Sequence, residues 1–552
     1  MRVFLLNHPV KDFFFTPQRA YPLALLYLAT ALKKNGQQVK IFDFLSGNKK
    51  TTLEVPEKFA YLKRYYKPNL SAFRLFSRYF CFGTNEAEFV GRVREFAPDA
   101  AGISASFSAY ADSALQVAAL IKKTDPKIAV IVGGRAATVW PRLFLKDKNV
   151  DFVLRGEGEE TLPRFCQRLE FGGPGRVAGL CYRSGGRLKI SNQIPFVKDL
   201  DGLPLPDRGF IDQNRYIFQG RVLVSLLASR GCGRGCTFCA VRERLRWRSP
   251  QNVVAELRDC FVRGARHFNF EDDNINLHPG FNQILDSIIA EFGGQAGISF
   301  MNGMLSLGLD KKTRDKLKTA GLTHIDLSLA SCSAAHRLKL GRDENAKKVF
   351  QVSKDFSRRK IPATVHFIVG FPGQDFDSAL ADARVIADKP ALLGPSIFYP
   401  VIESPSFAGL VREKLVDIKN YPAFRSSAAS LDKFISRDRI FFLFYLCRII
   451  NFLKQSLDTL GVKKVRQGLC REKIPAEGAI GRTELSLFLM GRVLREGKIF
   501  RVQEKPNASA GQYQFFAEDF ISDKDLFQAF KKLKVRSLLG RQIILGVKSC
   551  FL

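Results

Sequence analysis

Three cysteines, Cys232, Cys236 and Cys239, form a CxxxCxxC pattern directly after the apolar run of residues 222–227. Soft thiolates favour iron–sulfur clusters or zinc, and closed structural sites of either kind normally use four protein ligands. This segment supplies three, so one metal position would stay open to a small molecule. A structural zinc site or three buried thiols is the plainer alternative, but no fourth ligand lies within a few residues. We therefore expect an open iron–sulfur cluster.

This loop closely resembles that of the radical S-adenosylmethionine (SAM) superfamily, where an aromatic residue, here Phe238, precedes the last cysteine. The resemblance implies a [4Fe-4S] cluster whose open iron is chelated by SAM, which is then reductively cleaved to a 5′-deoxyadenosyl radical. It also implies a partial (β/α)6 TIM barrel with its active site at the C-terminal ends of the strands. Six candidate strands fit that barrel: residues 222–228, 267–270, 297–301, 324–329, 363–369 and 395–399.

The resemblance assigns an acidic run after the second barrel strand to the amino group of SAM. These residues are Glu271, Asp272 and Asp273. A carboxylate suits that cation, although acids in this place could instead cap the next helix.

Two further strand ends are implied to contact SAM. Ser328 ends the fourth strand, but Ala330 stands where many relatives carry glutamate, so one usual polar contact is missing. Gly370 lies in the turn after the fifth strand, near the expected position of the adenine.

The first 171 residues alternate short β-rich runs with helical patterns, which predicts a doubly wound (Rossmann-like) parallel sheet. Such sheets bind ligands beyond the carboxyl ends of their strands, where small residues permit close approach. The expected strands are residues 3–6, 39–42, 101–104, 128–132 and 152–154, and the expected helices are 23–34, 112–123 and 159–169.

Four segments of this region, residues 21–29, 102–104, 132–134 and 150–159, resemble in order the cobalamin (B12)-binding domain that precedes many radical SAM cores. The glycines could also serve helix entry and turn geometry in any doubly wound domain. The cobalamin contacts that the resemblance implies are Ser104, Ser106, Gly133, Gly134, Gly156 and Glu157.

One departure concerns the end of the first strand, where cobalamin domains with a DxHxxG loop supply a histidine to cobalt. This chain has Asn7 and His8 there, without that motif. We expect His8 to be an ordinary turn residue. Either cobalt has no protein histidine below it, as the resemblance implies for this subgroup, or the domain does not bind cobalamin.

We expect four regions: a cobalamin-binding-like domain (1–172), a hairpin and linker (173–215), a radical SAM core (216–404) and a mostly helical C-terminal region (405–552). An aromatic and basic insertion at about 52–88 is predicted to form one or two amphipathic helices over the sheet edge, although such interleaving can also stack nucleic-acid bases. The apolar segment 440–453 is predicted to be a buried helix, with a position on a membrane surface as the alternative.

The composition adds broad limits. The net charge of +33, from 86 Lys and Arg against 53 Asp and Glu, could serve nucleic acid, an anionic membrane or an acidic substrate, or could simply solvate the surface. Eleven cysteines, an odd number, fit a reducing compartment better than a disulfide framework. The N-terminal apolar run is too short for a signal peptide. These features predict a cytoplasmic protein.

Together the resemblances imply a cobalamin-dependent radical SAM enzyme that abstracts hydrogen from an unactivated carbon for methyl transfer. It would act on a small-molecule or lipid-like substrate and take electrons from a donor such as flavodoxin or ferredoxin. Non-methylating cyclisation or oxidative rearrangement is the first alternative, and a non-catalytic iron–sulfur protein is another. RNA modification is less expected, since the radical SAM methylthiotransferases have an N-terminal domain with three further cluster cysteines, which this chain lacks. Neither the substrate nor a catalytic residue is identified.

Overall fold

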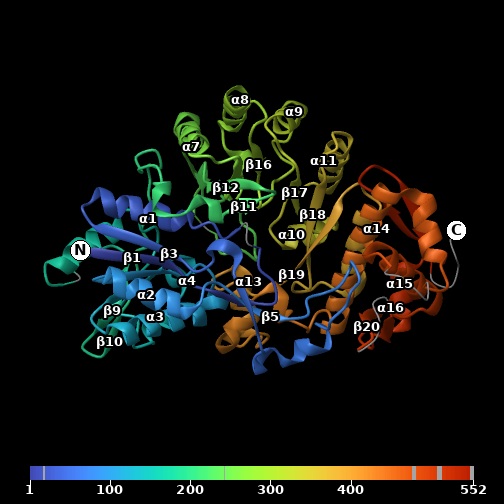
Figure 1. The fold of residues 1–552 in the computed structure, drawn as a ribbon, viewed down its shortest axis with the longest axis horizontal. Coiled ribbons are helices and arrows are strands. Elements are labelled where there is room, and N and C mark those ends of the chain that lie inside the picture. Colours follow the sequence, from blue (N-terminus) through green and yellow to red (C-terminus); the bar gives the residue numbers. More distant parts are fainter. Residues whose placement is uncertain (17–18, 174, 242, 475–479, 507–511, 547–552) are drawn as a thin grey trace.

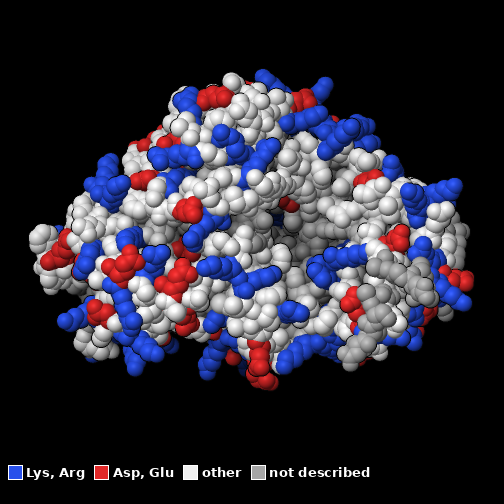
Figure 2. All heavy atoms as spheres, in the orientation of Figure 1, with Lys and Arg blue, Asp and Glu red and all other residues white. Residues whose placement is uncertain are grey.

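The structure, a computed structural model, describes residues 1–16, 19–173, 175–241, 243–474, 480–506 and 512–546. Figure 1 shows three parts: a sheet domain on the left, a strand-and-helix barrel at the top and a largely helical region on the right. Lys and Arg side chains are spread over the face seen in Figure 2, and this face is hollowed between the barrel and the C-terminal region.

The first domain is built on a seven-stranded sheet in the order β10-β9-β8-β7-β6-β1-β3. All five expected strands are present, and they pair in parallel. The expected hairpin, β9 and β10, joins the same sheet in antiparallel fashion, so the sheet continues past residue 172. The strands are β1 (Arg2–Asn7), β3 (Gln38–Asp43), β6 (Ala100–Ser104), β7 (Ala129–Gly133), β8 (Phe152–Leu154), β9 (Leu180–Ser184) and β10 (Arg187–Lys189).

Helices cover both faces of this sheet, because successive residues of each buried strand point to opposite sides. In β1, Val3 and Leu5 pack in a cluster with α1 (Leu23–Lys34) and α6 (Thr161–Glu170). Phe4 and Leu6 pack in another cluster with α2 (Glu86–Phe96) and α3 (Ala111–Thr124). The predicted doubly wound architecture is confirmed.

The strand order places a crevice at the carboxyl end of β1. The chain passes from β1 to β3 on one side of β1 and reaches β6 on its other side, and such a switch point is where open α/β sheets bind ligands. Asn7 pairs with Ser104, and Ser104 pairs with Gly133, so three of the strand ends lie side by side there.

The second domain is a six-stranded partial barrel. Its first three strands pair in parallel, as do its last three, and two parallel bridges, Ile298 with Leu322 and Met304 with Leu327, link the halves. Figure 1 shows the helices on the outside. The strands are β12 (Arg221–Leu226), β15 (His267–Phe270), β16 (Gly297–Ser299), β17 (Ile325–Ala330), β18 (Ala363–Val369) and β19 (Leu392–Ile397). The main helices between them are α7 (Pro250–Val262), α8 (Phe281–Phe292), α9 (Lys311–Thr319), α11 (Ala346–Arg358) and α12 (Phe376–Ala387).

The insertion differs from its prediction. It holds a 3-10 helix, Glu57–Arg64, between β4 (Lys50–Leu53) and β5 (Tyr79–Phe82). In a separate small sheet β5 pairs with β4 on one side and with β2 (Val10–Asp12) on the other. Its rings pack on a C-terminal helix: the centroids of Tyr65 and Phe441 are 4.1 Å apart, and those of Phe73 and Tyr445 are 5.4 Å apart. The prediction of amphipathic helices over the sheet edge was wrong, because the apolar side chains contact residues remote in the sequence.

The C-terminal region is mainly helical, as expected, and adds two hairpins that the sequence patterns did not reveal. By length and composition α14 could cross a membrane, but 78% of its most apolar window is buried inside the protein, as in a core helix. This agrees with the predicted buried helix. The elements are α13 (Pro405–Arg412), α14 (Arg437–Cys470), α15 (Arg482–Glu496), α16 (Asp523–Phe530), the hairpin of β20 (Phe500–Glu504) with β21 (Tyr513–Ala517), and that of β22 (Leu533–Arg536) with β23 (Gln542–Leu545).

Candidate active site

The cysteine loop lies beyond the carboxyl end of β12, between the two short paired strands β13 (Ser229–Arg230) and β14 (Arg246–Trp247). Gly231 adopts a φ of +85°, and a Cβ there would lie 2.5 Å from the carbonyl oxygen of Arg244, so only glycine fits this entrance. The amide of Thr237 donates to the carbonyl of Leu340, and the carbonyl of Thr237 accepts from Ser406. The loop is therefore anchored to the far side of the barrel and to the C-terminal region.

The three sulfurs converge. Burial raises the pKa of the Cys232 and Cys239 thiols, and nearby Asp273 and the Cys236 sulfur raise both further. Two polar side chains donate to sulfur: Asn274 to Cys232, and Arg342 to Cys236 at 3.5 Å. Donors aimed at sulfur are suited to thiolates that carry a metal centre, because a metal deprotonates its thiols outright.

This donor set fits a three-thiolate cluster better than a closed zinc site. The loop provides three cysteine thiolates, one fewer than the four ligands of a closed structural zinc site. The three thiolates with their N–H donors would hold a cluster and leave one iron to another ligand. Asn274 and Arg342 were missed in the sequence. Asn274 directly follows the acidic run, whereas nothing local marked Arg342.

The acidic run divides into different roles. Asp272 is fully buried and accepts hydrogen bonds from the amide of Ala228 and the hydroxyl of Ser229, so it ties the end of β15 to the start of the cysteine loop. Burial raises the pKa of Asp272 to about 7. Glu271 and Asp273 remain as candidates for a cationic amino group. Burial raises the pKa of each carboxyl group, and nearby Arg19 of the first domain offsets only part of that rise.

The remaining SAM candidates line the same end of the barrel. Phe238 packs with Ile368, Phe371 and Ala330 in one apolar cluster. Ala330 has a φ of +71° beside a register shift in β17. Alanine is strained in this region, and such strain often marks functional sites.

Ser328 and Gly370 hold their strand ends through the backbone. The carbonyl of Ser328 accepts from Arg342, the same side chain that reaches Cys236. Gly370 has a φ of +82°, and its amide donates to the side chain of Gln374 at 2.7 Å. Both residues therefore border the loop region that the sequence assigned to SAM.

The switch-point edge of the first sheet suits a large flat ligand. Ser106 is exposed, and the side chain of Phe107 beside it is 63% exposed. A Cβ on Gly133 would meet just one atom within 4 Å, the carbonyl oxygen of Leu154, so space lies before it. Gly134 has a φ of +98° and packs against the backbone of Ala105. These observations fit a cobalamin that rests on the strand ends.

Gly156 and Glu157 contact other segments of the protein and are not open to a ligand as Ser106 and Gly133 are. A Cβ on Gly156 would collide with the backbone of Pro195 at 2.3 Å. Arg246 donates to both carboxylate oxygens of Glu157, at 2.8 and 2.9 Å, and Arg230 lies 3.5 Å away. Burial alone would raise the pKa of Glu157, but these arginines hold it below its usual range. Their visible role is to join the first domain to the cysteine loop.

The single histidine of the first domain directly follows the end of β1. His8 is buried, and its Nδ1 is 2.9 Å from the carbonyl of Pro9. Burial lowers the pKa of His8. This geometry is that of a turn residue, as expected.

Arg135, the first residue of α4 (Arg135–Val139), connects the two candidate sites. It follows Gly133 and Gly134 directly and donates to the Glu243 carboxylate and the Ala240 carbonyl in the segment after the third cysteine. The strand ends assigned to cobalamin and the cysteine loop thus face each other across a short distance. Nothing in the local sequence marked Arg135.

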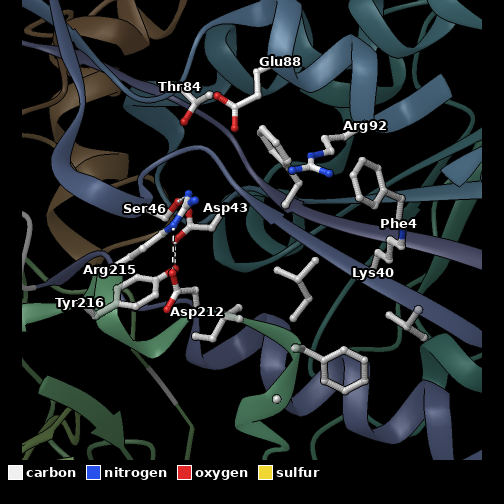
Figure 3. A pocket seen from close by; sticks show the side chains of 16 residues that line it. Phe4, Lys40, Asp43, Ser46, Thr84, Glu88, Arg92, Asp212, Arg215 and Tyr216 are labelled. Atoms are coloured by element: carbon white, nitrogen blue, oxygen red, sulfur yellow. Dashed lines mark hydrogen bonds and ion pairs between the residues drawn. The ribbon is translucent and has the colours of Figure 1, made fainter. Parts of the chain in front are cut away.

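A cavity of about 410 Å³ lies at the β3 edge, away from this site, between α2 and the linker (Figure 3). In it the hydroxyl of Tyr216 donates to Asp43 at 2.7 Å. Burial raises the pKa of Asp43 to about 6. The labelled charged groups of both signs point into this space, so it has no single charge preference.

Comparison with known proteins finds two family models that match parts of the chain. Residues 226–386 match the family model of the radical SAM superfamily, and residues 78–165 match that of the B12 binding domain. The chain is 29% identical over 297 residues to cytidylyl-2-hydroxyethylphosphonate methyltransferase of Streptomyces wedmorensis, covering 47% of this chain and 52% of that protein.

Two further similarities bear on the chemistry and the fold. The chain is 26% identical over 339 residues to the anaerobic magnesium-protoporphyrin IX monomethyl ester cyclase of Cereibacter sphaeroides, covering 58% of this chain and 54% of that one. It thus spans about half the length of these two relatives. The radical SAM methyltransferase TsrM of Kitasatospora setae, solved with tryptophan and a SAM analogue, superposes with a TM-score of 0.58 at 15% identity, covering 75% of this chain and 76% of that one.

Proposed function

Since the chain belongs to the radical SAM superfamily and carries a B12-binding domain ahead of its barrel, we propose that it is a cobalamin-dependent methyltransferase acting on an unactivated carbon. The observation that carries this proposal is the apposition of two sites: the cysteine loop and the small-residue strand ends meet through Arg135. When bound, the cluster with SAM supplies a hydrogen-abstracting oxidant, and cobalamin supplies a methyl carrier.

The side chains of this protein would bind and orient those groups. The cluster would be held by Cys232, Cys236 and Cys239. Asn274 donates a hydrogen bond to the sulfur of Cys232, and Arg342 donates one to the sulfur of Cys236. Glu271 or Asp273 would accept from the amino group of SAM, with Phe238 in the apolar wall beside it.

The proposed division of labour gives residues 1–172 to cobalamin, residues 216–404 to the cluster and SAM, and residues 405–552 to the shape of the substrate chamber. The substrate would be a small or lipid-like molecule, and a donor such as flavodoxin or ferredoxin would supply electrons in the cytoplasm.

The first test is cofactor loading without any substrate. Anaerobically reconstituted protein should bind about four irons and about four sulfides per chain, lose them when Cys232, Cys236 and Cys239 are all changed to alanine, and keep them in Cys470→Ala, whose thiol is exposed and far along the chain. Equilibrium dialysis with hydroxocobalamin should show uptake at micromolar concentration. If the cluster forms and no cobalamin binds, the methyl-transfer proposal fails.

A second candidate is oxidative cyclisation, favoured by the similarity to the magnesium-protoporphyrin cyclase over a larger share of this chain. The two candidates differ in one substrate-free reaction. A methyltransferase loaded with reduced cobalamin should take the methyl group from SAM and release S-adenosylhomocysteine. Cobalamin uptake without that release would favour cyclisation.

A further inference from the structure

The inner face of the barrel carries a titratable cluster that the sites above do not use. Nε2 of His366 on β18 lies 2.8 Å from Oδ1 of Asp326 on β17. Nε2 of His324 lies 3.4 Å from the same oxygen and 2.9 Å from the hydroxyl of Thr364. Two imidazoles therefore converge on one carboxylate.

Strand alternation places this cluster inside the barrel. Leu327 and Val365 point the other way, into the buried core beneath the outer helices. Ile368 shares the face of His366, two residues nearer the carboxyl end, and packs against the same apolar cluster as Phe238 of the cysteine loop. Two strand residues span roughly 7 Å. His366 thus lies one pleat below the loop that would hold the cluster.

These polar groups line open space. The side chains of His324, Asp326 and His366 are 38%, 25% and 40% exposed, whereas barrel interiors are normally filled with branched apolar residues. Gly394 on β19 makes room for the ring, because a Cβ there would lie 2.5 Å from Nδ1 of His366. The hollow in Figure 2 opens where Figure 1 places β18 and β19.

The opposite wall is polar too, but its groups satisfy one another. Nε2 of His267 is 2.9 Å from the hydroxyl of Ser299, which donates to Asn269 at 2.9 Å, and Asn269 donates to Glu271. His267 and Asn269 are fully buried. Burial lowers the pKa of His267 to about 4, so this histidine is neutral at pH 7. The wall formed by His324, Asp326 and His366 is therefore the one whose polar groups can still bond a ligand.

The charge state of the cluster selects its ligand. Burial alone would raise the pKa of Asp326, but the hydrogen bonds from His324 and His366, together with their electrostatic attraction, outweigh it and hold that pKa below its usual range. An ionised carboxylate ligand could offer this wall only hydrogen-bond acceptors. When Nε2–H of His366 donates to Asp326, the other ring nitrogen, Nδ1, is an acceptor.

We propose that His366, oriented by Asp326, binds the substrate by accepting a hydrogen bond from a hydroxyl or N–H group on an uncharged part of it, one pleat below the cysteine loop. That this ligand is the substrate rests on the proposed function. The preference for an uncharged hydrogen-bond donor does not rest on it, because that preference follows from the cluster of His324, Asp326 and His366 alone.

This preference can be tested on the full chain with three small aromatic molecules that differ only in their substituent: benzyl alcohol, benzoate and toluene. Their binding is followed by ligand-observed NMR. The wild type should prefer the alcohol to both others. His366→Leu should weaken alcohol binding about fivefold, the effect of one hydrogen bond, and leave toluene unchanged. Asp326→Asn should improve benzoate binding. His336→Leu, which changes an imidazole on α10 (Ala334–Lys339), is the matched control and should alter none of these.

A second measurement keeps the proposal testable if a variant misfolds. The chain has six histidines, so ¹⁵N-histidine spectra of the wild type are tractable, and His366→Gln assigns the resonance. The Nδ1 resonance of His366 should shift on addition of benzyl alcohol. No shift with saturating alcohol, or equal alcohol affinity in His366→Leu, overturns the proposal. Because cobalamin uptake is measured separately, the two proposals can fail independently.

Discussion

At the scale of single residues, Gly134 occupies a backbone conformation, φ +98° and ψ −179°, that essentially glycine alone adopts. A Cβ there would lie 2.8 Å from the carbonyl oxygen of Ala105, which belongs to the neighbouring strand end. Gly134→Ala should push the two strand ends apart and weaken cobalamin binding at least about tenfold, or about 1.4 kcal/mol. Equilibrium dialysis measures the change.

The matched control for Gly134→Ala is Gly36→Ala. Gly36 also has a positive φ, +84°, but an added Cβ would meet nothing within 4 Å. Both variants should lose some stability, and the control should keep its cobalamin affinity. Equal affinity in both variants would remove these strand ends from the cobalamin site.

Asp43 makes a prediction about pH. Burial raises its pKa to about 6, whereas an unfolded aspartate titrates near 4. Between these values the folded chain binds more protons than the unfolded chain, so this residue contributes stability below about pH 4 that is lost as the pH rises through about 6. The loss is on the order of 3 kcal/mol.

Asp43→Asn should remove that dependence. The thermal midpoint of the wild type, relative to the variant, should fall between about pH 4 and pH 6 and stay level above. The hydroxyl of Tyr216 can still donate to the amide oxygen. Glu413→Gln, at an exposed position, serves as the control. A constant difference between wild type and variant across this range would show that folding does not raise the pKa of Asp43.

At the scale of elements, α14 protects the edge of the barrel sheet. The side-chain amide of Asn451 accepts from the amide of Leu393 and donates to its carbonyl, both at 2.8 Å, as a neighbouring strand would. Asn451→Leu should leave two backbone groups of β19 without partners and cost about 2–5 kcal/mol. Calorimetry should show an earlier unfolding transition. Gln455→Leu, at an exposed position on the same helix, should leave that transition unchanged.

The sequence predicted the buried helix at residues 440–453, but not the strand that the amide of Asn451 bonds. Contacts between residues far apart in the sequence also explain the other differences between prediction and structure. The places of Cys232 in the loop after the first barrel strand and of Gly134 after β7 could be predicted, because the spacing of the cysteines and the conformation of the glycine are local features. Asp272 and Glu157 were placed at the right strand ends, but their hydrogen-bond partners lie on other elements. The insertion was predicted wrongly because its apolar spacing matched a helix while its partners came from α14 and α15.

At the scale of the molecule, partly buried ion pairs join the first domain to the cysteine loop. Arg246 binds Glu157 in bidentate fashion, and Arg230 binds Glu159 at 2.7 Å. We expect a double-mutant cycle of Glu157→Gln and Arg246→Gln to give a coupling energy of about 2 kcal/mol. Hydrogen exchange should also show faster opening of the cysteine loop in either variant.

An exposed pair provides the comparison for that cycle. Lys33 and Asp207 are 3.0 Å apart, with side chains 63% and 31% exposed. A cycle on this pair should give about 0–1 kcal/mol. If both cycles give the same small value, the domains are held together by their apolar contacts, and Glu157 becomes available again as a cobalamin ligand.

The insertion packs on C-terminal helices that are synthesised much later, so its aromatic side chains stay uncovered during much of translation. The hydroxyl of Tyr65 donates to Asp438 at 2.5 Å across 373 residues of chain, and the amide of Ala72 donates to Ser486. At a translation rate of about 5–20 residues per second, these aromatic side chains wait on the order of 20–70 s after leaving the ribosome before α14 exists to cover them. The nascent chain therefore exposes this aromatic segment for most of its synthesis, and during that time the segment is prone to aggregation.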